Sequence, residues 1–148
     1  NTELKAKGML DLELSINDYE KIIKEVAERV FDALNGLGMN ERGYQLAFEE
    51  ELRARFHSVS TEVTLNLYYT ASNGNRIKTG SGRVDILIDD NVIVELKRDM
   101  KGSDRTIKEA EKQCKRYMVG MNKKHCFLVI FTAKGPNVIK HNNDSYSD

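Results

Sequence analysis

Residues 83–97 have the sequence RVDILIDDNVIVELK, and the fold predicted for the chain follows from this stretch. Two short apolar runs flank the polar connection Asp89-Asp90-Asn91, as in a β-hairpin. If Ile88 pairs with Val92, these three residues form the hairpin loop, with Asn91 in a left-handed conformation. This register would turn six apolar side chains of the two strands toward one core. They are Val84, Ile86, Ile88, Val92, Val94 and Leu96.

The same register brings three charged side chains together. It sets Asp85 opposite Glu95, and Lys97 follows two residues later on the face of Glu95, whereas a two-residue loop would set Asp85 against Leu96. Adjacent carboxylates repel unless a cation lies between them, and oxygen ligands on short strands suit Mg²⁺ or Mn²⁺. The alternative is a salt-bridged, half-exposed sheet face. The apolar run around Glu95 and Lys97 weakens that alternative, because charges in a central strand are costly without a partner.

The rest of the chain predicts helices and strands around this hairpin. Apolar residues at helical spacing predict helices over 18–35, 40–56 and 104–119, the last capped by Ser103, and alternation or continuous apolar runs predict further strands over 59–69 and 126–132. A turn is expected at 72–75. The polar residues 135–148 predict a flexible tail. The order indicates one mixed α/β (α+β) domain over residues 1–148, in which a helix crosses between strands.

Composition excludes several classes of protein. The 148 residues are 40% hydrophobic and 31% charged, which is too hydrophobic for a disordered chain. No stretch is long and apolar enough to span a membrane, and residues 1–14 lack the layout of a signal peptide, so an intracellular location is expected. Cys114 and Cys126 have no zinc-binding spacing and are expected to be buried, reduced thiols.

The net charge of zero argues against binding nucleic acid through bulk positive charge, but the charge is unevenly distributed. Residues 1–62 carry eight basic and thirteen acidic side chains, a net of −5. Residues 97–124 carry ten basic and four acidic side chains, a net of +6. The positive segment therefore begins at Lys97, beside the proposed carboxylate pair.

Three motifs together resemble a known family. Asp85 followed by Glu95-Leu96-Lys97 resembles the D…(D/E)-x-K signature of the PD-(D/E)XK nuclease superfamily. Residues 38–44, GMNERGY, match the G-x-x-E-x-x-Y motif of the GxxExxY proteins within it, and residues 113–117, QCKRY, match a Q-x-x-x-Y element. The resemblance covers residues 36–133 and implies a restriction-endonuclease-like αβββαβ core. A central mixed sheet would be flanked by helices, with an extra N-terminal helix. Val84 stands where the signature has proline.

The resemblance also implies the roles of individual residues. Asp85 and Glu95 would bind Mg²⁺ or Mn²⁺, aided by the backbone carbonyl of Leu96 and by Glu41, directly or through water. Lys97 would be the catalytic lysine. The implied activity is metal-dependent hydrolysis of phosphodiester bonds, in DNA rather than RNA. The competing hypothesis is a non-catalytic module that keeps the nuclease fold and binds nucleic acid or protein.

Gln113 and Tyr117 would contact a phosphate or position the lysine. Each motif residue also has a structural alternative. Tyr44 and Tyr117 lie on apolar helix stripes and suit the core, and Glu41 suits the N-terminus of a helix because of the helix dipole. Residues 49–51, three glutamates, are expected on a solvated face, although the last of them could approach the site.

Basic residues near the site predict contacts with the phosphates of a nucleic acid. Helical spacing sets four of them on one face of the third helix while its apolar residues face the core. The predicted nucleic-acid-binding residues are Arg98, Lys108, Lys112, Lys115 and Arg116. A homodimer is a further expectation, because many nucleases with this core pair up to cut both strands.

Overall fold

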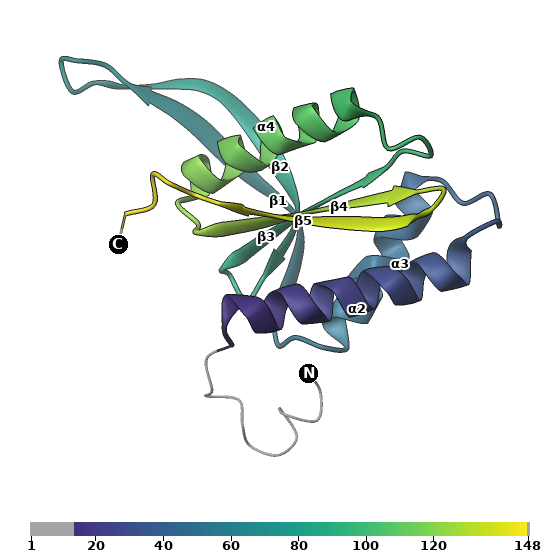
Figure 1. Ribbon diagram of the computed structural model, residues 1–148. Coiled ribbons are helices and arrows are strands. Elements are labelled where there is room, and N and C mark those ends of the chain that lie inside the picture. The colour runs from purple at the N-terminus through teal and green to yellow at the C-terminus, as the bar shows by residue number, and fades with distance from the viewer. Residues whose placement is uncertain (1–13, 148) are drawn as a thin grey trace.

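A computed structural model describes residues 14–147. Its five strands form one sheet in the order β1-β2-β3-β4-β5, in which only β3 and β4 are parallel. Helices α2 and α3 cover one face of this mixed sheet and α4 covers the other (Figure 1). The elements are α2 (Ile16–Leu34), α3 (Glu41–Arg53), β1 (Val59–Thr70), β2 (Arg76–Ile88), β3 (Val92–Arg98), α4 (Asp104–Met121), β4 (His125–Thr132) and β5 (Gly135–Asn142).

This arrangement confirms the predicted mixed α/β fold with its αβββαβ core and extra N-terminal helix. The helices begin at polar caps, of which the sequence analysis predicts Ser103. Ser15 and Asp18 form a capping box at α2, the Asn40 side chain accepts the N–H of Gly43 at α3, and Ser103 caps α4. Within the described residues, no helix is long and apolar enough to cross a membrane.

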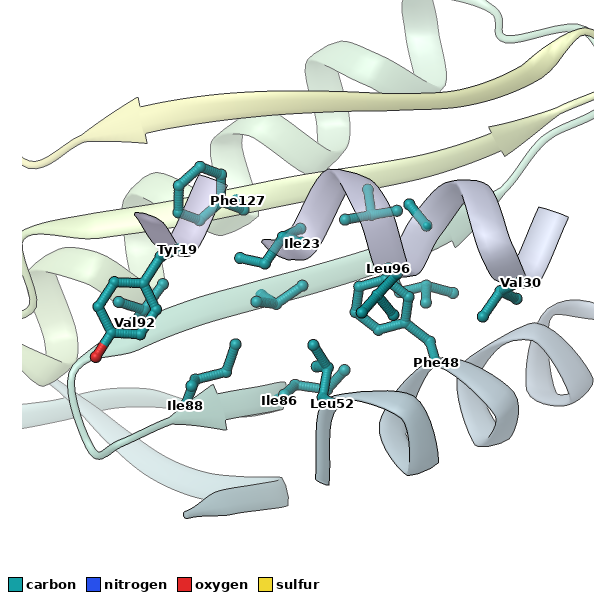
Figure 2. Packing of buried hydrophobic residues seen from close by; sticks show 14 of the residues in the cluster. Tyr19, Ile23, Val30, Phe48, Leu52, Ile86, Ile88, Val92, Leu96 and Phe127 are labelled. Atoms are coloured by element: carbon teal, nitrogen blue, oxygen red, sulfur yellow. The ribbon is translucent and has the colours of Figure 1, made fainter. Parts of the chain in front are cut away.

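The core beneath α2 and α3 fixes where the sheet lies. Figure 2 shows side chains of the two helices meeting those of the sheet, and all the side chains labelled there are buried. The labelled members are Tyr19, Ile23 and Val30 from α2, Phe48 and Leu52 from α3, and Ile86, Ile88, Val92, Leu96 and Phe127 from the sheet. A second cluster under α4 includes Cys114 and Cys126, both reduced and buried as predicted.

The flexible tail predicted from residue 135 is wrong for residues 135–142, which form β5. This strand pairs antiparallel with β4 from Thr132↔Gly135 to His125↔Asn142. Its two apolar side chains serve both cores, since Val138 packs on the α2 side and Ile139 on the α4 side. The strand is at the edge of the sheet and half exposed, so its composition is polar and the apolar alternation is short.

The β2–β3 hairpin has the predicted register, with Ile88 paired to Val92. Its turn differs from the prediction, because Asp89 and Asp90 are the left-handed residues (φ 53° and 54°) and Asn91 is not. The N–H of Asn91 donates to the carbonyl of Ile88 at 2.9 Å, which closes the turn around the two aspartates. The Asp89 carboxylate also accepts a hydrogen bond from the Tyr19 hydroxyl at 2.8 Å, which ties the turn to α2.

Candidate active site

Asp85 and Glu95 lie where strands β2 and β3 separate. The backbone ladder between the strands covers only Ile86–Ile88 and Val92–Val94. Beyond this ladder, the carboxylate of each strand accepts a hydrogen bond from a backbone N–H group of the other strand. The N–H of Asp85 donates to Glu95 Oε2 at 2.8 Å, and the N–H of Leu96 donates to Asp85 Oδ2 at 3.0 Å. The predicted juxtaposition is therefore present, and reciprocal side chain–backbone bonds hold it.

An irregularity in β1 lies opposite this point. Glu62 has φ 53°, and the β1–β2 ladder passes from Thr61↔Ile86 to Val63↔Val84 without a pair at Asp85. At Asp85, therefore, the backbone of β2 has no ladder pair with either β1 or β3. One prediction fails here, because Val84 packs in the α4 cluster rather than with Ile86. A strand that can rotate between these residues does not keep strict alternation.

Burial raises the pKa of both carboxyl groups and so disfavours their ionised forms. Glu95 is only 2% exposed, and burial together with the neighbouring Asp85 carboxylate raises the pKa of Glu95 to about 8. Burial also raises the pKa of Asp85. The nearby Lys97 charge lowers the pKa of both groups, but this effect is smaller than that of burial. Near neutral pH the pair therefore retains a proton unless a cation compensates for its charge.

Glu41 lies at the first residue of α3, beside the end of β3. Its Oε1 accepts the N–H of Arg98 at 3.0 Å, and its charge raises the pKa of both Asp85 and Glu95. It does not form a ready-made three-carboxylate site with them. Within residues 14–147, no group of three or more His, Cys, Asp or Glu side chains is arranged to hold a metal ion. The metal-binding role of Glu41 stays a prediction.

Two further polar residues of α3 were missed from sequence. Gln45 and Glu49 are buried, and the amide of Gln45 donates to Glu49 Oε2 at 2.8 Å. Glu49 is 4% exposed and raises the pKa of Asp85, so its prediction as a solvated residue is wrong. The spacing 41, 45, 49 follows one helix face and could have indicated this. Glu51 instead pairs with Arg29 at 3.0 Å.

Lys97 is half-buried on β3, two residues after Glu95, while Leu96 between them is buried in the core. This alternation is the one that the sequence predicts. The effect of the Lys97 charge on both carboxyl groups puts it in their electrostatic neighbourhood. The catalytic role of Lys97 and the metal contact of the Leu96 carbonyl stay predictions.

Gln113 and Tyr117 connect α4 to β2 near the carboxylate pair. The Gln113 amide donates to the Tyr117 hydroxyl at 2.6 Å, and the backbone N–H of Arg83 donates to the same oxygen at 3.4 Å. The ring of Tyr117 is buried against Gly82, where a Cβ would lie 2.5 Å from a ring carbon. Tyr117 is therefore a core residue whose hydroxyl reaches the strand two residues before Asp85.

The basic residues predicted to bind nucleic acid divide into two groups. Four are exposed on α4 opposite its buried residues, as the helical spacing predicts: Lys108, Lys112, Lys115 and Arg116. Arg98 lies on the other side of the sheet, where its guanidinium group is 5.6 Å from the ring centroid of Tyr44. Tyr44 itself is buried against Phe131, with ring centroids 4.7 Å apart, which agrees with the alternative interpretation of Tyr44 as a core residue.

Comparisons with known proteins bear on this geometry. The profile of the PD-(D/E)XK nuclease superfamily matches residues 17–141. A crystal structure of SSO0001 is similar in fold, with a TM-score of 0.58 and 15% sequence identity over 96% of this chain and 75% of that chain. No curated protein matches significantly. The profile covers the carboxylate pair, the lysine and α4, so the chain belongs to the PD-(D/E)XK nuclease superfamily.

Proposed function

We propose that the protein is a divalent-metal-dependent nuclease that hydrolyses phosphodiester bonds in DNA. The observation that carries this proposal is the reciprocal anchoring of Asp85 and Glu95. Two carboxyl groups fixed side by side and shielded from water are unfavourable for the fold alone, because their charges repel and are poorly solvated. A cation between them removes that penalty, which accounts for a pair of this kind next to a lysine.

The donor set fits Mg²⁺ or Mn²⁺. Each carboxylate uses one oxygen for its backbone bond, and Asp85 Oδ1 and Glu95 Oε1 accept no hydrogen bond from the described residues. These two oxygens, the Leu96 carbonyl and Glu41 through water would hold the ion, and hard oxygen ligands are those that both metals prefer. When bound, the ion would lower the pKa of a water ligand and stabilise charge on a phosphoryl oxygen.

The chain's own residues supply the remaining functions. Lys97 adds a compact positive charge that would stabilise the phosphate as negative charge develops on it. Gln113 and Tyr117 would position α4 against β2, and the exposed lysines of α4 would contact phosphates. Within the superfamily, the G-x-x-E-x-x-Y motif supports assignment to the GxxExxY proteins. DNA as substrate, a homodimeric state and an intracellular location belong to the same proposal.

A cleavage panel tests this function. Plasmid DNA, single-stranded DNA and RNA are incubated with Mg²⁺, Mn²⁺ or EDTA and with wild type or Asp85→Asn. The matched control is Asp90→Asn, because Asp90 is an exposed turn residue of the same hairpin and asparagine tolerates its left-handed conformation. We expect metal-dependent cleavage of DNA by wild type and Asp90→Asn and none by Asp85→Asn.

Each other outcome has a defined meaning. Cleavage by Asp85→Asn equal to that of wild type would refute the proposed site. Cleavage of RNA alone would correct the substrate. A metal-induced rise in melting temperature without cleavage of any substrate would favour the non-catalytic binding module.

A further inference from the structure

The β1–β2 hairpin extends beyond the rest of the sheet as an arm. Its strands pair from Val59↔Ile88 to Thr70↔Arg76, whereas β3 pairs only with the last three residues of β2. Figure 1 shows this arm projecting at the upper left, beside α4. The C-terminal part of α4 packs closely on its base, since a Cβ at Gly120 would lie 2.7 Å from the side chain of Leu67. A groove is left between the arm and the helix.

The groove, of about 620 Å³, is positively charged. Arg76 of the arm and Lys112, Lys115 and Arg116 of α4 line it, and none of the described residues that line it is acidic. The hollow between α2 and α3, of about 1050 Å³, has the opposite character, with five acidic and two basic lining residues. A polyanion is therefore attracted to the groove beside α4 and repelled from the larger hollow.

The same groove exposes aromatic and apolar surface. Tyr68 is 46% exposed, with the Arg76 guanidinium 4.1 Å from its ring centroid, and Val119 on the opposite wall is 53% exposed. Of the eight large hydrophobic side chains exposed in the described part of the chain, Tyr68 and Val119 line this groove. Cationic grooves with aromatic side chains suit single strands, whose bases have free faces to stack. A duplex hides those faces, so exposed apolar side chains would gain little from it.

The position of the groove links it to the carboxylate pair. Lys112 and Arg116 line it, and each is the immediate neighbour of a member of the Gln113–Tyr117 pair. The hydroxyl of Tyr117 bonds to the backbone of Arg83, two residues from Asp85. The groove therefore adjoins the part of α4 that contacts β2 just before Asp85.

We propose that the groove between the β1–β2 arm and α4 binds single-stranded nucleic acid and leads it to the Asp85–Glu95 pair. The destination rests on the proposed nuclease function, whereas binding in the groove requires no metal. The arm thus supplies half of the binding surface, through Tyr68 and Arg76, and the exposed cations of α4 supply the other half.

Fluorescence anisotropy in EDTA tests binding without cleavage. The probe is a labelled oligothymidylate of about 12 nucleotides, compared with a blunt duplex of the same length. Tyr68→Ala and Arg76→Ala should each weaken binding of the single strand about tenfold. Tyr69→Ala is the matched control, because Tyr69 is an exposed tyrosine of the same arm that does not line the groove, and Arg105→Ala is the control for charge on α4. Both controls should bind within about twofold of wild type.

The salt dependence gives an independent readout. Contacts from four cations predict a slope of log affinity against log salt of about −3 for a single strand, and Arg76→Ala should reduce its magnitude by about 0.7. Equal losses in Tyr68→Ala and Tyr69→Ala, or tighter binding of the duplex than of the single strand, would overturn the proposal. Groove-dependent binding without cleavage of any DNA or RNA substrate in Mn²⁺ would refute the nuclease function alone. Cleavage with no effect of Tyr68→Ala on binding would refute the groove alone.

Discussion

Replacing Glu95 with glutamine should stabilise the metal-free protein at alkaline pH, although it removes a proposed metal ligand. Glutamine keeps an oxygen that can accept the N–H of Asp85, and its amide can donate toward the Asp85 carboxylate. It also removes the charge that burial and Asp85 disfavour. The variant should therefore retain the geometry at this point of the sheet and lose the repulsion.

The magnitude follows from the pKa of Glu95, which rises from its ordinary 4.5 to about 8 on folding. Below pH 4.5 the Glu95 carboxyl group is protonated in both the folded and the unfolded chain, so it does not lower the free energy of unfolding there. Between the two values the unfolded chain is ionised while the folded chain keeps the proton, so the stability of wild type falls as pH rises, by up to about 1.4 kcal/mol per pH unit. From about pH 5.5 to the folded value of about 8, this slope amounts to about 3 kcal/mol for the titration of the Glu95–Asp85 pair.

Urea denaturation in EDTA at about pH 5.5 and about pH 8.5 measures this effect. The stability of Glu95→Gln relative to wild type should increase between the two pH values by the amount above, and Glu50→Gln should show no such increase because Glu50 is exposed. The same pH dependence in wild type and Glu95→Gln, or a lower stability of the variant at both pH values, would refute the account of the carboxylate pair.

Two further predictions concern the metal and the support of the site. The Mn²⁺-induced rise in melting temperature should be larger at about pH 8.5 than at about pH 6, because the ion competes with the proton that the carboxylate pair retains. The rise should be absent in Asp85→Asn. A rise that does not depend on pH would contradict this prediction. Gly82→Ala should lower the free energy of unfolding, measured by urea denaturation, by about 1–3 kcal/mol, because the added Cβ would lie 2.5 Å from the Tyr117 ring. An unchanged free energy of unfolding would contradict this prediction and show that the ring moves freely.

The fold and the carboxylate pair could be predicted because local rules agree along the hairpin. Hydrophobic matching of Ile88 with Val92 determines the register, and the register brings Asp85 to Glu95. The reciprocal bonds to backbone N–H groups could not be predicted, since they depend on the strands separating at this point. At that point β1 has a left-handed residue, Glu62, and β2 and β3 have different outer neighbours.

Other features depend on contacts between distant segments. The polar strand β5 forms because β4 offers an open edge, which composition does not reveal. Glu49 is buried because α3 packs over the sheet beside Asp85, and its two glutamate neighbours in the sequence suggest only a solvated run. Residues 76–82 of β2 lack a buried face, so alternation does not indicate the arm that they form with β1.

The most direct test of the central claim is the single-turnover rate of Mn²⁺-dependent cleavage of labelled DNA by wild type and by Lys97→Met. Lys134→Met, an exposed lysine outside the site, is the matched control. Lys97→Met should keep the metal-induced rise in melting temperature and lose at least about a hundredfold in rate, because the charge that stabilises the phosphate is gone. A rate equal to that of Lys134→Met would contradict the assignment of this site as the nuclease centre.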